Sequence, residues 1–236
     1  MTKIEVKSLL TNLINDFHFE KANKYKLIIF GGLLGDFDSF EYAINLSSFM
    51  NSKKIKDLDI FFIAIGNQQG KEKFCKYTGF PSDNLKVVEN NKLHNLVGAS
   101  KGLNIGLGGW INMTLMLMGI GSSKTLLEVI RGYTGDKDSN QIYKNCDQIN
   151  LFNSFKFSGE LFEKSFGKGY LRPFELATFR LNNMLEIFKN WKDYMIETNY
   201  LPQRSCTYIL DENNDVIYKY FSKDILNYSE NMKSPL

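Results

Sequence analysis

Cysteine and histidine are scarce in this chain. It has three cysteines, Cys75, Cys146 and Cys206, and none of them has the C-x-x-C spacing. An odd number without paired spacing argues against a disulfide framework and a zinc site, and it fits a reducing cytoplasm. His18 and His94 are isolated, and nothing spaces them as metal ligands. We therefore expect a cytoplasmic protein with no metal and no cofactor.

Long apolar runs and blocks of positive charge are also absent. No stretch reaches the roughly 18 apolar residues that cross a bilayer, so we expect no transmembrane segment. The nearest candidate is Trp110 to Ile120, whose length favours a buried helix over a segment lying on a membrane surface. The first residues carry charges within their apolar pattern, which argues against a signal peptide. The net charge is only +3 and the basic residues are spread among acids, which excludes a typical nucleic-acid partner.

What the first hundred residues contain is an alternation of helical and strand patterns. Apolar residues recur at helical spacing from Ile4 to Phe17, which predicts an amphipathic helix. Continuous apolar runs predict strands that are buried on both faces. The remaining predicted strands and helices are Lys26–Phe30, Ser39–Met50, Asp59–Gly66, Gln69–Thr78, Leu85–Val88 and Lys92–Val97.

The middle of the chain is different. Residues 101 to about 150 are rich in glycine, with helical patches at Trp110–Met118 and Ser123–Arg131, and residues 150–169 are aromatic without a clear period. A long helix is predicted over Pro173–Met195, with one apolar face. CTYIL and VIYKY, separated by DENND, predict a closing hairpin. We expect one domain over 1–236, with a mostly helical insertion over 101–198 before that hairpin.

The stretch LIIFGGLLGDFDSFEYA places acids and a serine where a buried strand ends and a helix begins. In α/β proteins this junction is where active sites are built. Asp38 and Glu41 form a D-x-x-E pattern that is typical of a capping box, so Asp38 is the predicted N-cap. Asp36 either serves the helix dipole alone or takes part in binding, and Ser39 is expected to be a polar residue of the first turn.

Four segments in the right order resemble the AhpC/TSA-type, peroxiredoxin-like branch of the thioredoxin superfamily. They are KLIIFGGLLGDFDSFEYA, IAIGNQQGKEKFCKYTGFP, LKVVENNKLHNLVGASKGL and LPQRSCTYILDENNDVIYKY. The resemblance covers roughly residues 24–103 and 200–228. It implies an α/β fold with a thioredoxin-like central sheet flanked by helices. It also implies an antioxidant redox activity for the family.

The resemblance places Asp36 and Ser39 on the two cysteines of the family's C-x-x-C turn. That chemistry needs a thiolate, whose pKa is lowered at a helix N-terminus. A carboxylate cannot form a sulfenic acid or a disulfide, so the site is expected to be degenerate. Arg204 falls on an arginine that approaches the active thiolate in the wider group. We therefore expect an ion pair between Asp36 and Arg204, although a surface arginine is the simpler alternative.

The remaining thiols and the partners stay open. Cys206, at the start of the closing hairpin, and Cys75 are the redox candidates, yet both are more simply explained as buried packing residues. Whether the chain is an enzyme is therefore undecided. The favoured function is binding of a protein or small-molecule partner at the old cleft, with a homo-oligomer possible. A weak thiol-dependent antioxidant or oxidoreductase is the first alternative.

A phosphotransferase of the haloacid-dehalogenase type is the second alternative. In such enzymes the first Asp of a D-x-D loop attacks phosphorus and the second is an acid/base. Asp36-x-Asp38 resembles that loop, and Asp136 and Asp138 could imitate its magnesium-binding acids. However, Asp36 does not follow the strand directly, and Phe40 stands where threonine or valine is expected.

Overall fold

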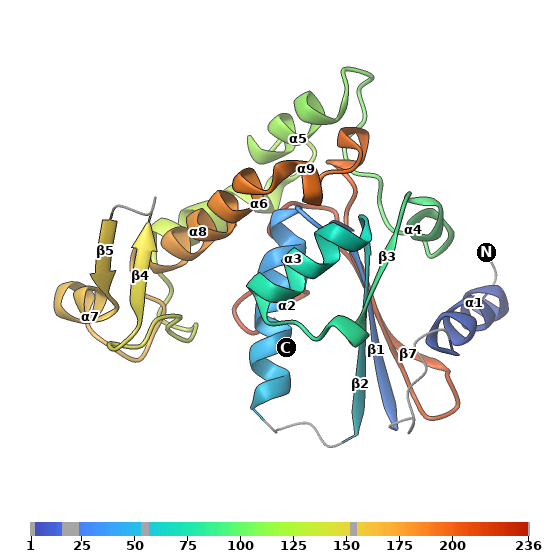
Figure 1. Ribbon diagram of the computed structural model, residues 1–236, viewed down its shortest axis with the longest axis horizontal. Coiled ribbons are helices and arrows are strands. Elements are labelled where there is room, and N and C mark those ends of the chain that lie inside the picture. Colours follow the sequence, from blue (N-terminus) through green and yellow to red (C-terminus); the bar gives the residue numbers. More distant parts are fainter. Residues whose placement is uncertain (1–2, 16–23, 53–56, 152–154, 236) are drawn as a thin grey trace.

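A five-stranded mixed sheet forms the centre of the computed structural model, which describes residues 3–15, 24–52, 57–151 and 155–235 (Figure 1). Its strands are β1 (Tyr25–Leu33), β2 (Leu58–Ile65), β3 (Leu85–Val88), β6 (Cys206–Leu210) and β7 (Val216–Phe221). The order across the sheet is β3-β2-β1-β6-β7. β1, β2 and β3 run parallel, whereas β6 is antiparallel to both β1 and β7. This is a thioredoxin-like sheet, as the sequence predicted.

Helices cover both faces of the sheet and fill the long connection before β6. They are α1 (Lys3–Asn15), α2 (Phe37–Asn51), α3 (Gln68–Thr78), α4 (Lys92–Leu96), α5 (Gly109–Leu117), α6 (Ser123–Thr134), α7 (Glu160–Phe166), α8 (Glu175–Lys189) and α9 (Trp191–Tyr194). Short 3-10 turns precede β3 (Ser82–Asn84) and β6 (Thr198–Tyr200). Two short strands, β4 (Gln148–Leu151) and β5 (Phe155–Ser158), form a separate hairpin.

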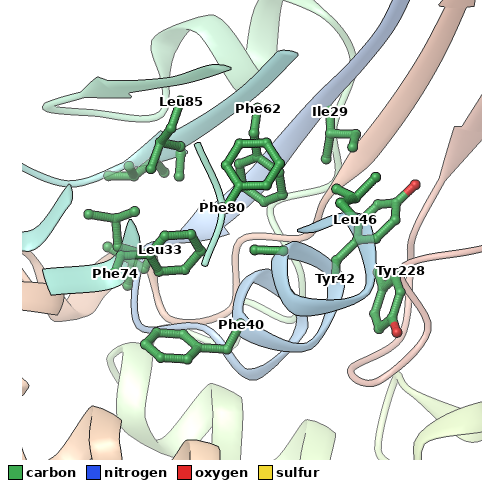
Figure 2. Close-up of a cluster of buried hydrophobic side chains, with 14 of the residues drawn as sticks. Ile29, Leu33, Phe40, Tyr42, Leu46, Phe62, Phe74, Phe80, Leu85 and Tyr228 are labelled. Carbon is green, nitrogen blue, oxygen red and sulfur yellow. The ribbon is translucent and has the colours of Figure 1, made fainter. Parts of the chain in front are cut away.

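Alternation along β1 divides the core into two layers. Leu27 and Ile29 face α2 and α3, whereas Ile28 and Phe30 belong to the cluster beneath α1. Figure 2 shows the first layer, in which rings from α2, α3 and β2 pack together. Phe40 of α2 is fully buried and meets the Phe74 ring edge-on, with the ring centroids 5.0 Å apart. This layer fixes the start of α2 against the sheet.

Two predicted helices have different boundaries in the structure. The helix predicted from Ser39 begins at Phe37, because Asp36 has the extended N-cap conformation (φ −72°, ψ 139°). The helix predicted over residues 173–195 is broken at Asn190, which leaves the helical conformation and hydrogen-bonds the Glu186 carbonyl. Asparagine side chains compete with the helical backbone in this way. Phe17 and His18 lie outside the described residues.

The segment between α4 and β6 contains the helices α5 to α9, joined by loops and one hairpin, and it projects from the sheet (Figure 1). The β4–β5 hairpin within it was not predicted. The buried-helix interpretation of Trp110–Ile120 holds for one face only, since Met116 is fully buried whereas Trp110 and Ile111 are nearly half exposed. Trp110 instead stacks on Trp191, with ring centroids 4.9 Å apart, and so joins α5 to α9. None of the helices in the described ranges is both long and apolar enough to span a bilayer.

Replacement of Phe40 by alanine tests the packing of α2 on the sheet. The ring is fully buried among Phe74, Tyr77 and Tyr194, so we expect Phe40→Ala to lower the free energy of unfolding by about 3–5 kcal/mol. Phe155→Ala is the matched control, because that ring is 66% exposed. Urea denaturation measures both variants, and equal losses would contradict the packing described.

Candidate functional site

The end of β1, just before the turn into α2, contains two glycines that have no room for a side chain. The register between β1 and β2 shifts after Phe30, at Gly31 and Gly32. A Cβ on Gly32 would lie 2.7 Å from Asp36 Oδ2 and 2.9 Å from the Gln203 carbonyl oxygen. The glycine therefore lets the Asp36 side chain fold back over the end of β1, toward the loop that enters β6.

Arg204 lies in that loop and is fully buried between two carboxylates. Its Nη2 is 3.5 Å from Asp36 Oδ2, and its Nη1 donates to Asp38 Oδ2 at 3.0 Å. The expected ion pair with Asp36 is thus present, but Asp38 is the closer partner. The guanidinium also donates to the carbonyls of Pro202 (2.9 Å) and Leu201 (3.1 Å). These hydrogen bonds hold the loop before β6 in a compact turn around the Arg204 side chain.

Asp38 connects a third segment to this ion cluster, which we define as Asp36, Asp38 and Arg204. Its Oδ1 accepts the backbone N–H of Leu226 at 2.6 Å. The cluster holds two carboxyls and one guanidinium away from water. Burial raises the pKa of both carboxyls, and repulsion from Asp36 raises the pKa of Asp38 further, while Arg204 opposes both shifts. Two carboxylates share one guanidinium, so one negative charge lacks a counter-charge within the cluster. The pair of carboxyls therefore takes up a proton at a pH above the usual range for aspartate.

Ser39 is buried but does not belong to the ion cluster. Its hydroxyl has no hydrogen-bond partner, and it lies beneath the backbone of Gly31, where a Cβ would be 2.9 Å from it. The structure therefore brings Asp36 and Arg204 together and leaves Ser39 beside the strand. Asp36 makes no side-chain cap hydrogen bond either, and its Oδ2 lies within ion-pair distance of Arg204 without a hydrogen bond to it.

His94 contacts the same turn from the other face of the sheet. It is fully buried, and its Nε2 lies 2.5 Å from the Gly31 carbonyl oxygen. Its ring meets Phe30 edge-on. Burial lowers the pKa of His94 to about 4, so the ring is neutral at pH 7 and Nε2 carries the proton that it donates to Gly31. The sequence had indicated only an isolated histidine.

The three cysteines are free. Cys206 is fully buried in the cluster beneath α1, and burial raises the pKa of its thiol. Cys75 is partly buried on α3, where burial also raises its thiol pKa. Cys146 is exposed in the segment before β4. A thiol with a raised pKa is a poor nucleophile at neutral pH, because the thiolate is the reactive form.

Glu41 has a different partner from the one that the capping-box pattern predicted. Its carboxylate accepts two bonds from Arg180 of α8, at 2.7 and 3.0 Å. Arg180 also donates to Glu128 of α6, both to its carbonyl at 2.9 Å and to its carboxylate at 3.1 Å. α2 is therefore joined to two helices of the following segment through charged groups. The capping box is absent, because the helix begins two residues earlier than its D-x-x-E pattern requires.

The acids proposed to imitate a magnesium site have partners of their own. Asp136 pairs with Arg131 at 3.7 Å and with Lys233 at 3.6 Å, and Asp138 pairs with Lys233 at 2.8 Å. Within the described ranges, no group of three or more His, Cys, Asp or Glu side chains is arranged to hold a metal ion.

Comparison with protein families gives one match. A family model described as AhpC/TSA antioxidant enzyme matches residues 45–224, well over half of the chain. The match includes Arg204 and the three cysteines, but it begins inside α2, after both Asp36 and Ser39. No curated protein and no solved structure matches the chain.

Paired substitutions test which carboxylate holds Arg204. Asp38→Asn leaves the buried guanidinium with only the more distant Asp36, so we expect a loss of about 3–5 kcal/mol in the free energy of unfolding. Asp36→Asn keeps the 3.0 Å partner and removes the repulsion between the two acids, so we expect a smaller loss. Urea denaturation at pH 7 measures both. A larger loss for Asp36→Asn would overturn this ranking.

The pH dependence of stability tests the burial of His94. The folded protein binds the imidazole proton only near pH 4, whereas the unfolded chain binds it near pH 6.5. Stability should therefore fall as the pH drops from 6.5 toward 4, by up to about 1.4 kcal/mol per unit. His94→Gln removes this contribution and should show a shallower decline. The raised pKa values of Asp36 and Asp38 change stability in the opposite direction, but they do so equally in the parent and in His94→Gln. The difference between the two stability curves therefore isolates His94, and parallel curves would refute the argument.

Proposed function

The chain belongs to the AhpC/TSA antioxidant enzyme family, and on that premise we propose that it binds a partner at the start of α2 instead of reducing peroxides there. The observation that carries the proposal is the enclosure of Arg204 between Asp36 and Asp38. In this interpretation, Asp36 and Ser39 occupy the places of the family's reactive cysteines. The ion cluster then fills the space in which a thiolate and its peroxide would meet.

The distribution of thiols supports this proposal. Reduction of a peroxide needs a thiolate that attacks one peroxide oxygen, and a carboxylate cannot replace it. Cys206 is sealed in the core and Cys75 is half-buried on α3, each with a raised thiol pKa. The alternative of a thiol-dependent antioxidant would require one of them to become accessible. No observation favours that alternative.

The phosphotransferase alternative has little support. It needs Asp36 free to attack phosphorus and Asp38 free to exchange a proton, but both face Arg204. Asp136 and Asp138 are engaged with a different cation, Lys233.

Two cavities are lined by immediate neighbours of the ion cluster and offer places for a partner. One, of about 390 Å³, is lined by Gln203, Pro202 and several asparagines around Lys101. The other, of about 430 Å³, is lined by Phe37 and Leu226 on the side of α8. Cavities of this size are typical of small-molecule sites.

We propose further that residues 101–198 form one insertion within a single domain over 1–236. A cytoplasmic location, with no cofactor, fits the free cysteines.

Peroxide consumption tests the proposed loss of catalysis. With hydrogen peroxide and either dithiothreitol or a thioredoxin system, we expect no turnover above the rate without protein. Cys206→Ser and Cys75→Ser should behave like the parent. Turnover that Cys206→Ser abolishes would overturn the proposal in favour of the thiol alternative. Maleimide labelling of the folded protein provides an independent check, because it should modify the exposed Cys146 and spare Cys206 until urea unfolds the chain.

A further inference from the structure

The cavity of about 430 Å³ beside α8 has mostly apolar walls. They come from α2, α5, α6 and α8, including Leu117, Val129, Leu181 and Met184. α6 packs on α5 and on α8, and α8 packs on α2 (Figure 1). The residues that line the cavity place it where these helices meet. Tyr133 and Phe174 line it as well, although both rings are about half exposed. A small molecule can therefore enter from solvent at these two rings.

One polar side chain in the wall lacks a partner. Asn183 is 3% exposed and lines the cavity. Its Oδ1 accepts a hydrogen bond from Tyr77 at 3.2 Å, whereas its Nδ2 has no partner. A buried amide N–H without an acceptor costs about 1–3 kcal/mol. A ligand with a hydrogen-bond acceptor would remove that cost. The unpartnered N–H of Asn183 therefore indicates that the ligand carries an acceptor.

The charged groups in the wall argue against an anionic ligand. Arg180 lines the cavity, but Glu41 and Glu128 both bind its guanidinium. A ligand carboxylate placed beside Arg180 would thus meet two other carboxylates. An uncharged ligand avoids that repulsion and keeps the benefit of the apolar walls.

We propose that this cavity binds a small, uncharged, mainly apolar molecule carrying a hydrogen-bond acceptor such as a carbonyl group, which Asn183 recognises. The proposal rests on the binding role proposed above and names its ligand class. It also connects that ligand to the ion cluster. Phe37 lies between Asp36 and Asp38 in the chain, and Leu226 donates its N–H to Asp38, so both cavity residues are one bond or one contact from the cluster.

Fluorescence titration with prodan, an uncharged naphthyl ketone, tests this inference on the full chain. We expect saturable binding with a blue-shifted emission, and clearly weaker binding of the anionic naphthyl dye ANS. Asn183→Leu should weaken prodan binding about three- to tenfold, the equivalent of one neutral hydrogen bond. Asn182→Leu is the matched control on the same helix, since Asn182 does not line the cavity, and it should bind prodan like the parent.

Filling the cavity separates binding inside it from binding to exposed apolar side chains. Ala177→Phe places a ring in the cavity and should abolish prodan binding. Gly132→Ala narrows the same cavity from α6. Its Cβ would lie 3.4 Å from the nearest atom, so this variant should fold, and it decides the matter if circular dichroism shows Ala177→Phe unfolded. The expected result for Gly132→Ala is weaker prodan binding.

Several results would overturn the inference. They are the absence of saturable prodan binding, unchanged prodan binding in the folded filled variant, equal effects of Asn182→Leu and Asn183→Leu, or stronger binding of ANS than of prodan. These outcomes differ from a failure of the proposed function. Peroxide turnover alongside specific prodan binding would remove the proposed loss of catalysis and keep the cavity. The absence of both peroxide turnover and prodan binding would keep the proposed loss of catalysis and remove the proposed ligand of the cavity.

Discussion

Burial of the Arg204 guanidinium is the constraint on which the arrangement around α2 depends. A fully buried guanidinium must be neutralised and hydrogen-bonded, and four oxygens from two short segments meet that need: Asp36 and Asp38, Leu201 and Pro202. Asp38 in turn holds the Leu226 N–H. The start of α2, the loop before β6 and the chain after β7 therefore come together around one charge. Glycine is required at position 32 because the Asp36 carboxylate occupies the space that a side chain there would need.

Arginine has a specialised role throughout this molecule. The sequence contains four arginines among 29 basic residues, and each of the four forms an ion pair with a carboxylate. Arg172 and Glu175 form such a pair with both side chains completely buried. Arginine suits these positions because its planar fork binds a carboxylate through two parallel bonds and it keeps its charge when buried. The bonds of Arg180 to Glu41 and Glu128 let charged groups, as well as apolar ones, attach the helices of residues 101–198 to the core.

The sequence predicted the central sheet well, because β1 and β2 are continuous apolar runs and the closing hairpin alternates around a polar turn. It also predicted the contact between Asp36 and Arg204, through the family resemblance. It missed the role of Asp38, because D-x-x-E fits a capping box equally well and the N–H that Asp38 binds belongs to Leu226, 188 positions away. It missed the β4–β5 hairpin for another reason. Apolar and polar residues do alternate in both strands, QINL and FKFS, but each strand is only four residues long, which is too short for alternation alone to distinguish it from a loop.

The stack of Trp110 on Trp191 has a consequence for how this molecule is observed. The chain contains two tryptophans, and both are in that stack, which joins α5 to α9. Intrinsic tryptophan emission therefore reports mainly on the contact between α5 and α9, and through Trp191 on the edge of the core that α9 covers. Far-ultraviolet circular dichroism averages over the whole chain. Any difference between the two signals during unfolding measures how independently α5 detaches from the rest of the structure.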